Sequence, residues 1–301
     1  MKFFKEHSMH KLVLFLLALT LSWATPSVST QWVEDNLKNP KLVLVDTASD
    51  DVFALEGHIP NAVLTPLSAW RYSVGKHFLV RDARSIEAHM RSLGIDNDSH
   101  VVLYSHINSP KDFLVASYIY WAMKHYGLAK VSIMDGGFNQ WNQEKRPTTQ
   151  EESISKKGTF VAKASKSDMV DLAYVKAHIG KVPMIDARPA ENYFGAKPSD
   201  GVVRLGHIAG AMSYFWGNSI EADYRLKSLD VVAKQLAQLA PNKKSEVIVY
   251  CTGGLETSYN YFVLAGYLGY TNVKLYDASM REWGNREDTP MRAYVWEMFA
   301  K

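Results

Sequence analysis

Short runs of apolar residues, rich in Val, Ile and Leu, recur along the chain between longer stretches of mixed polarity. Runs that are apolar throughout are typical of strands buried on both faces, as in a parallel sheet. The expected strands are 42–45, 101–104, 131–134, 184–185, 247–250 and 273–276. Helices are expected between them, among them 113–125 and 257–268, the second ended by Gly269. This succession predicts an α/β fold in which mainly parallel sheets are flanked by helices.

Four blocks of sequence occur twice in the same order, roughly 140–150 residues apart. The matched pairs are 42–46 with 182–186, 57–62 with 206–211, 101–105 with 247–251, and 135–141 with 277–283. A repeat of this kind predicts a duplicated domain. We expect one copy at 30–142, a polar linker at 143–165 and a second copy at 166–301. Ser105 in the first copy stands where Cys251 stands in the second.

The first 29 residues have the order of a secretory signal. Three lysines precede the apolar run 12–21, and small residues follow it. The run is shorter than the ~20 residues that a membrane helix needs, so a retained anchor is the less favoured alternative. Cleavage is expected after Ala24 or Ser29, and Thr30 would then cap a helix at the new amino terminus. We therefore expect a periplasmic or secreted protein without stable membrane insertion after cleavage.

Composition narrows the classes of partner. The chain is 47% hydrophobic, enough for two cores, and its net charge of +3 without a basic block gives no indication of nucleic-acid binding. Cys251 is the only cysteine, which excludes an intrachain disulfide. No His, Cys, Asp or Glu cluster has ligand spacing, so we expect no metal site.

The residues after Cys251 suggest an anion cradle. The cysteine follows a buried strand and precedes Gly253-Gly254 and a helix near Thr257, so several backbone N–H groups can turn toward its sulfur. These groups are expected to favour the thiolate, or a persulfide anion, over the neutral thiol. An inert buried cysteine is the alternative. The residues expected to bind substrate through this cradle are Thr252, Gly253, Gly254, Leu255, Glu256 and Thr257.

Together these features resemble the two-domain sulfurtransferases of the rhodanese family. The resemblance covers nearly all of the chain after the signal and rests on 186–188, 206–211, the cysteine loop and 277–283. It implies that Cys251 takes a sulfane sulfur from thiosulfate or 3-mercaptopyruvate. The resulting Cys251 persulfide would pass the sulfur to cyanide or a thiol acceptor, either a small molecule or a protein. It also implies an inactive first copy and no cofactor.

The resemblance assigns two further residues. Arg188 matches the family's substrate-side arginine, and its planar guanidinium suits the oxygens of thiosulfate or a carboxylate. A surface arginine paired with Glu191 is the alternative. Asp186 is expected to orient the loop in a supporting role rather than to transfer a proton.

The loop departs from the family pattern at three positions. Thiosulfate-preferring members carry cations where this chain has Thr252 and Gly253, and threonine or arginine where it has Glu256. A carboxylate beside the cysteine would repel both a thiolate and an anionic donor. We expect Glu256 to point to solvent; otherwise it selects a cationic or neutral acceptor. If it faces the pocket, Glu256→Gln should raise thiosulfate turnover.

Two other functions fit part of the pattern. Cysteine phosphatases also place a cysteine loop between a strand and a helix, but they need an arginine six residues after the cysteine, where this chain has Thr257. A persulfide carrier or binding protein, holding sulfur for a dedicated partner without turnover, is the stronger alternative.

Other conspicuous residues have ordinary structural explanations. His58 and His207 recur in both copies, as do Trp141 and Trp283, and we expect local structure from the first pair and packing from the second. An aromatic cluster in the second copy could wall the pocket or form a partner surface. Its members are Tyr193, Phe194, Tyr214, Phe215 and Trp216.

Overall fold

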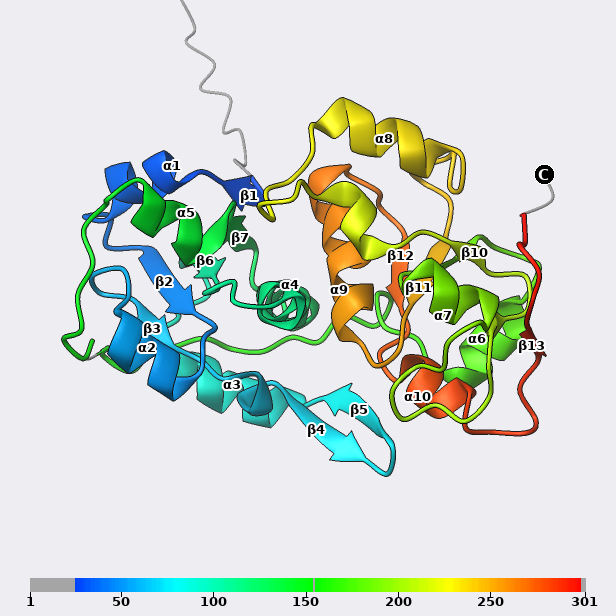
Figure 1. Cartoon of the computed structure of the whole chain (residues 1–301). Coiled ribbons are helices and arrows are strands. Elements are labelled where there is room, and N and C mark those ends of the chain that lie inside the picture. Colours follow the sequence, from blue (N-terminus) through cyan, green and yellow to red (C-terminus); the bar gives the residue numbers. More distant parts are fainter. Residues whose placement is uncertain (1–24, 154, 299–301) are drawn as a thin grey trace, which may run out of the picture.

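The computed structural model describes residues 25–153 and 155–298. It confirms the predicted architecture, because the chain folds into two α/β domains that lie side by side, each around its own parallel sheet (Figure 1). All six predicted strands are present. Each sheet thus brings the carboxyl ends of its strands to one edge, where ligands of such folds collect.

The first domain is built on a five-stranded parallel sheet of order β1-β7-β6-β2-β3. Its strands are β1 (Ser27–Val28), β2 (Leu42–Asp46), β3 (Val63–Leu64), β6 (His100–Tyr104) and β7 (Lys130–Met134). Its helices are α1 (Thr30–Asn36), α2 (Asp50–Glu56), η1 (Leu67–Ala69), α3 (Ala83–Ser92), α4 (Pro110–His125) and α5 (Gly137–Gln143). An antiparallel hairpin of β4 (Arg71–Val74) and β5 (His77–Val80) extends from this domain toward the second (Figure 1).

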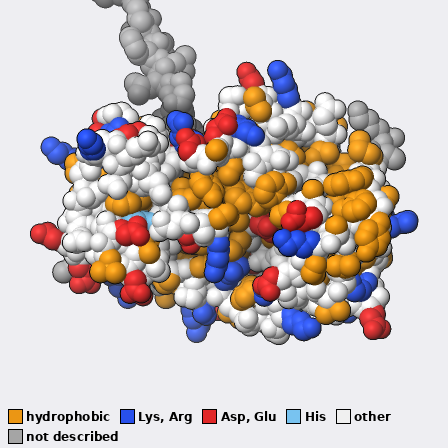
Figure 2. Space-filling view, viewed as in Figure 1, with side chains coloured by type: hydrophobic (Ala, Val, Ile, Leu, Met, Phe, Trp, Pro, Cys, Tyr) orange, Lys and Arg blue, Asp and Glu red, His pale blue; other side chains and the backbone are white. Residues whose placement is uncertain are grey.

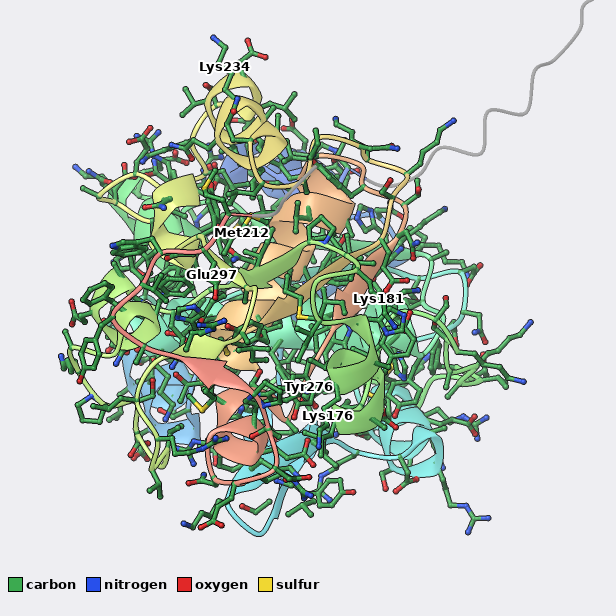
Figure 3. All side chains as sticks on the ribbon, turned by 90° about the vertical axis from the view of Figure 1, so that its right-hand side faces the viewer. Lys176, Lys181, Met212, Lys234, Tyr276 and Glu297 are labelled. Carbon is green, nitrogen blue, oxygen red and sulfur yellow. The ribbon has the colours of Figure 1, made fainter. Side chains whose placement is uncertain are left out.

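The second domain has a four-stranded parallel sheet of order β10-β8-β11-β12. Its strands are β8 (Met184–Asp186), β10 (Met212–Ser213), β11 (Val247–Tyr250) and β12 (Val273–Leu275), with β9 (His207–Ile208) and β13 (Met291–Arg292) forming a separate antiparallel pair. Its helices are α6 (Leu172–His178), α7 (Ala190–Phe194), η2 (Trp216–Ser219), α8 (Leu229–Ala237), α9 (Leu255–Tyr261), η3 (Phe262–Tyr267) and α10 (Ser279–Trp283). Figure 3 shows α8 and α6, marked by Lys234 and Lys176, at opposite ends of this domain.

The two sheets have the same strand order. A bridge between Met169 and Leu275 even supplies, at the edge of the second sheet, the position that β1 holds in the first. The repeated tryptophans are fully buried and make matching hydrogen bonds, from Trp141 to the Pro147 carbonyl (2.9 Å) and from Trp283 to the Pro290 carbonyl (3.0 Å). These contacts confirm both the repeat and the packing role of the tryptophans.

The repeated histidines also serve local structure in the described residues. The His58 ring bonds with the Glu151 carbonyl at 3.1 Å, and Nδ1 of His207 bonds with the Tyr193 carbonyl at 2.8 Å. Each histidine is buried. Both rings therefore tie a neighbouring segment to the strand ends, as expected.

The equivalent helices α4 and α9 pack against each other between the domains. The rings of Tyr120 and Phe262 lie 5.0 Å apart, and the hydroxyls of Ser117 and Ser258 lie 3.1 Å apart. The second helix begins two residues before the predicted position and changes to a π-helix over Phe262–Tyr267. Because residues of both domains contribute to one hydrophobic cluster, the domains are held in a fixed relation.

Two aspartates at repeated positions make reciprocal bonds across the domains. Asp135 of the first domain accepts the Leu226 N–H of the second at 2.9 Å. Asp277 of the second accepts the Val80 N–H of hairpin strand β5 at 2.7 Å. The second bond fixes the hairpin beside the carboxyl edge of the second sheet.

The amino-terminal prediction needs a correction. Strand β1 pairs with β7 and Val28 is buried, so the first sheet includes residues that were assigned to the signal. The cap of α1 is Ser29, whose side chain accepts the Trp32 N–H, whereas Thr30 donates to Glu144 instead. The remainder of the predicted signal, residues 1–24, lies outside the described residues.

The segment predicted as a linker is attached to the first domain. Phe160 is fully buried, and its N–H donates to the Ile95 carbonyl at 3.1 Å.

Across the described ranges 25–153 and 155–298, none of the helices combines the length and the apolar character needed to cross a bilayer.

Candidate active site

A cavity of about 600 Å³ opens at the carboxyl end of β11, between the two domains. The first domain contributes residues from the hairpin and the start of α4, and the second contributes the cysteine loop, η2 and α10. Figure 2 shows apolar side chains gathering on the face between the two halves. The charged and sulfur-bearing lining residues are Arg71, Lys111, Asp200, Cys251, Glu256 and Arg281.

The cysteine loop curls as predicted around Cys251, which lines the cavity although only 1% of its surface is exposed. The Gly254 N–H donates to Sγ at 3.1 Å. Gly254 has a φ of +97°, and a Cβ there would lie 2.5 Å from Oδ1 of Asp277, so the position requires glycine. Thr257, where a cysteine phosphatase would have arginine, is fully buried with its hydroxyl 3.3 Å from that of Ser279.

The surroundings do not favour a resting thiolate. Burial, followed by the charge of Glu256, raises the pKa of Cys251 to about 12, although the N–H groups of Gly253 and Thr257 act in the opposite direction. Desolvation of the sulfur therefore outweighs the loop dipoles. Burial thus opposes the ionised thiol that the loop was expected to favour at neutral pH, and a proton acceptor near the sulfur would assist its attack.

We expected Glu256 to point to solvent, but it does not. It is half-buried, lines the same cavity as Cys251, and accepts the Thr252 N–H at 3.4 Å. Its carboxylate therefore bonds to the backbone of the residue next to Cys251 and shares the cavity with the sulfur. Burial raises the pKa of Glu256, so this carboxyl holds a proton more readily than an exposed one.

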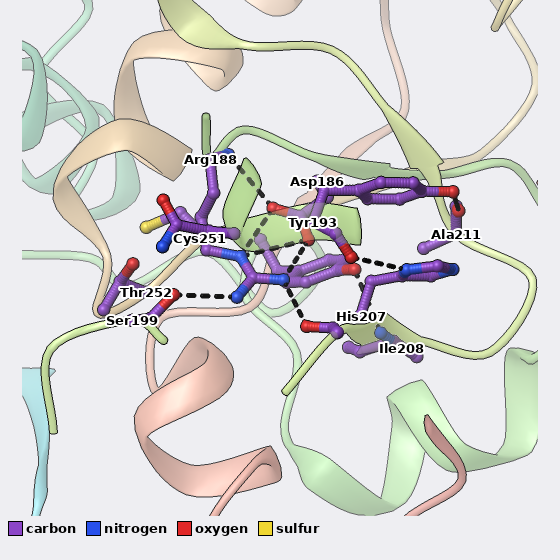
Figure 4. A network of polar contacts seen from close by, with 12 residues as sticks. Asp186, Arg188, Tyr193, Ser199, His207, Ile208, Ala211, Cys251 and Thr252 are labelled. Carbon is purple, nitrogen blue, oxygen red and sulfur yellow. Dashed lines mark hydrogen bonds and ion pairs between the residues drawn. The ribbon is translucent and has the colours of Figure 1, made fainter. Parts of the chain in front are cut away.

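Arg188 is not available to a substrate. Its Nε donates to Asp186 (2.9 Å), Nη1 to Ser199 (2.9 Å) and Nη2 to the Gly206 carbonyl (2.8 Å), as Figure 4 shows. The side chain is buried and is not part of the cavity wall. Both the substrate-binding expectation and its surface alternative with Glu191 are therefore wrong, because the guanidinium is held by a buried carboxylate. Asp186 also accepts the Arg188 N–H at 3.0 Å, and its expected role in orienting the cysteine loop stays a prediction.

Two other arginines face the cavity, and sequence reasoning missed both. Arg71 of strand β4 donates to the Gly253 carbonyl at 3.0 Å, and its guanidinium lies 4.3 Å from the centre of the Phe78 ring. Arg281 of α10 pairs with Asp200 and lies 5.1 Å from the same ring. Arg281 belongs to a repeated block at a strand end, which is a usable signal, whereas nothing local to Arg71 connects it with Cys251.

Ser279 is a third residue that the sequence did not reveal. Its hydroxyl accepts the Cys251 N–H at 3.1 Å and lies 4.0 Å from Sγ. Its φ of +52° is in the left-handed region, which is costly for a residue other than glycine. The matching position in the first domain is Gly137, with a φ of +58°. The strained serine therefore holds the backbone at the base of the cysteine loop.

The predicted aromatic cluster divides between several places. Phe215 and Trp216 wall the cavity. Tyr193 is buried against His207, with ring centres 3.8 Å apart, and Tyr214 is buried with its hydroxyl bonded to Ser219. Phe194, the remaining member, packs with Tyr294 and Trp296.

In the part of the chain that the structure describes, no group of three or more His, Cys, Asp or Glu side chains is placed to hold a metal ion.

The fold and the site define a tandem α/β protein in which one cysteine ends a central strand at an interdomain cavity. Rhodanese-like domains are matched at residues 29–144 and 171–286. The chain therefore belongs to the rhodanese family.

Relatives and solved structures agree with this assignment. The sulfur carrier protein TtuD of Thermus thermophilus is 32% identical over 90% of this chain and 98% of its own length. A Mycolicibacterium smegmatis protein with the provisional name of thiosulfate sulfurtransferase is 32% identical over 88% of this chain and 96% of its own. SseA of Escherichia coli, described as a 3-mercaptopyruvate sulfotransferase with the rhodanese fold, superposes with a TM-score of 0.73 at 25% identity, over 85% of this chain and 99% of its own.

Proposed function

We propose that the protein is a sulfurtransferase that moves a sulfane sulfur from an anionic donor through a Cys251 persulfide to a thiophilic acceptor. The observation that carries this proposal is the position of Cys251 at the base of a cavity lined by cations from both domains. A nucleophile, a donated N–H and an enclosed space are what a covalent two-step transfer needs.

The cations indicate the donor class. Arg71, Arg281 and Lys111 line the cavity, and guanidinium groups bind the oxygens of sulfonates and carboxylates well. Thiosulfate and 3-mercaptopyruvate both carry such oxygens next to a transferable sulfur. The names of TtuD and the Mycolicibacterium smegmatis protein support sulfur handling, and cyanide or a thiol would serve as acceptor.

A second candidate is a carrier that stores the persulfide for a protein acceptor. The name of TtuD favours it, as does the near-complete burial of Cys251. Enzyme and carrier would both add sulfur to Cys251, but only the enzyme would turn over with a small acceptor.

The test is cyanide-coupled thiocyanate formation, with thiosulfate and 3-mercaptopyruvate compared as donors. We expect repeated turnover by the wild type with at least one donor and none by Cys251→Ser. A single equivalent of thiocyanate per chain would favour the carrier. No thiocyanate from either donor would contradict the proposal.

We also propose that the protein is exported and cleaved after Ala24. Cleavage after Ser29 would remove β1 and the cap of α1, whereas cleavage after Ala24 leaves both in place. Amino-terminal sequencing of the exported protein should begin at Thr25. A mature chain that begins at Thr30, or one found only in the cytoplasm, would contradict this proposal.

A further inference from the structure

We propose that Glu256 is a catalytic residue that shares one proton with Cys251, accepting it when the sulfur attacks the donor and returning it when the sulfur leaves. This inference deepens the proposed sulfur transfer and rests on it. It also gives a role to the acidic residue that departs from the family pattern in the loop.

The geometry places the carboxyl where a proton acceptor is needed. Glu256 and Cys251 line one cavity, five residues apart on the same loop and helix start. The Thr252 N–H donates to Oε2 of Glu256 at 3.4 Å and so helps to orient the carboxyl. On the other side, the Gly254 N–H is directed at Sγ at 3.1 Å. The sulfur therefore has an N–H donor beside it and a separate proton acceptor in the same cavity.

The charges around the pair show why one shared negative charge is preferred. A thiolate beside a carboxylate would place two charges in a largely buried site, which is costly. A protonated carboxyl beside a thiolate avoids this cost and can donate a hydrogen bond to the sulfur. The other ionisable groups around the pair, in the cavity wall or buried behind it, are Arg71, Lys111, Asp186, Arg188, Asp200, Asp277 and Arg281. Of these, Asp186 is paired with Arg188, and Asp200 is paired with Arg281.

The step balances with no added reagent. The thiol proton moves to the Glu256 carboxylate while Sγ bonds to the outer sulfur of thiosulfate. The sulfur–sulfur bond of thiosulfate breaks, and its electron pair leaves with sulfite. The site then holds a persulfide anion beside a neutral carboxyl. Attack by cyanide on the outer sulfur releases thiocyanate, and the proton returns from Glu256 to Cys251.

The test uses alkylation by iodoacetamide, a neutral reagent, because Cys251 is the only thiol in the chain. With one proton shared by the pair, the wild-type rate should rise at acid pH and then level off within about pH 5 to 9. In Glu256→Gln the thiol must ionise by itself, so the rate should climb about tenfold per pH unit across the same range. The variant should thus react more slowly than the wild type at acid pH. At alkaline pH it should react faster, because the Glu256 carboxylate no longer repels the Cys251 thiolate.

Two variants serve as controls. Glu246→Gln removes a carboxyl from the other end of strand β11, where Glu246 accepts the Tyr174 hydroxyl at 2.9 Å, and should keep the wild-type profile. Glu256→Asp restores a carboxyl and should restore the plateau. Near-ultraviolet circular dichroism would verify that each variant is folded.

A wild-type rate that never levels off, or a Glu256→Gln profile that levels off where the wild type does, would overturn the inference. If the variant fails to fold, a wild-type rate that never levels off still overturns the inference. Because alkylation needs no sulfur donor, this outcome is separate from that of the thiocyanate assay. A wild-type alkylation rate that levels off as expected, together with no thiocyanate formation, would leave the proton sharing intact and contradict the sulfur transfer.

Discussion

Strands β6 and β11 hold the same place in the two sheets, yet the loops that follow them are built differently. After β6, the Ser105 hydroxyl bonds with that of Thr47 at 2.7 Å. The His106 ring fills the space beyond, stacked on Phe138 with ring centres 4.0 Å apart and bonded to Asp46 at 3.0 Å. After β11, Thr252, Gly253 and Gly254 bring no large side chain, and the cavity begins there.

The difference shows that the two copies contribute different parts of one cavity. The first domain has filled its own strand end, but it supplies Arg71 and Phe78 of the hairpin and Lys111 of α4 to the cavity of the second. Its Tyr118 also donates to Asp277 at 3.0 Å, beneath the cysteine loop. The first domain is therefore part of the proposed active site.

The largest effect should come from removing the cysteine of the second copy and placing one at the matching position of the first. Cys251→Ser should lower thiocyanate formation by at least about a thousandfold, because the nucleophile is lost. Adding Ser105→Cys should not restore activity, because the His106 ring fills the space next to that position. Steady-state assays of the single and double variants check this. A double variant with recovered turnover would show that the copies are functionally equivalent.

The contribution of the first domain can be tested at Arg71. Arg71→Ala removes a cation from the cavity and should raise the KM for thiosulfate about tenfold to a hundredfold, with a smaller change in kcat. Arg84→Ala, at an exposed position on α3 of the same domain, is the control and should leave both constants unchanged. Equal KM values for wild type and Arg71→Ala would exclude Arg71 from donor binding.

Arg188 should matter for stability rather than for binding. Arg188→Ala leaves Asp186 charged and buried without its partner, which typically costs about 3–5 kcal/mol of unfolding free energy. Lys197→Ala breaks only an exposed pair with Glu191 and should cost at most about 1 kcal/mol. Urea unfolding measures both. A stable Arg188→Ala protein with a raised KM would restore the substrate-binding role that the structure argues against.

Asp277 should produce a smaller, pH-dependent effect. Burial raises the pKa of Asp277 from 3.8 to about 6, so the folded protein binds this proton more tightly than the unfolded chain does. Stability from this group is thus present at low pH and is lost as the pH rises from about 4 to about 6, by up to about 3 kcal/mol. Asp277→Asn removes the titration, so the variant should gain on the wild type over that interval in urea unfolding. A constant difference between the two proteins would show that Asp277 is not perturbed.

The fold was largely predictable because the repeat and the apolar runs report on backbone structure. Buried parallel strands such as β6 and β11 need continuous apolar residues, and the position of Gly269 was enough to end a helix. The start of the first domain was harder to predict, because small residues such as Ser27 suit a cleavage site and a short edge strand equally well.

The site was predictable only where one segment builds it. The cysteine loop curls as expected because Gly254 lies next to the reactive residue in the chain. Arg71 was missed and Arg188 was assigned to the substrate, because the direction of a long side chain depends on its folded partners, here Gly253 for Arg71 and Asp186 for Arg188. The orientation of Glu256 and the pKa of Cys251 likewise depend on burial, which sequence spacing does not show.

Intact-protein mass spectrometry tests the central claim most directly. After brief exposure to thiosulfate, the wild type should carry one added sulfur atom, located on the peptide of Cys251, and cyanide should remove it as one equivalent of thiocyanate. Cys251→Ser should gain nothing. A wild-type protein that gains no sulfur, or that carries it on a residue other than Cys251, would contradict the account.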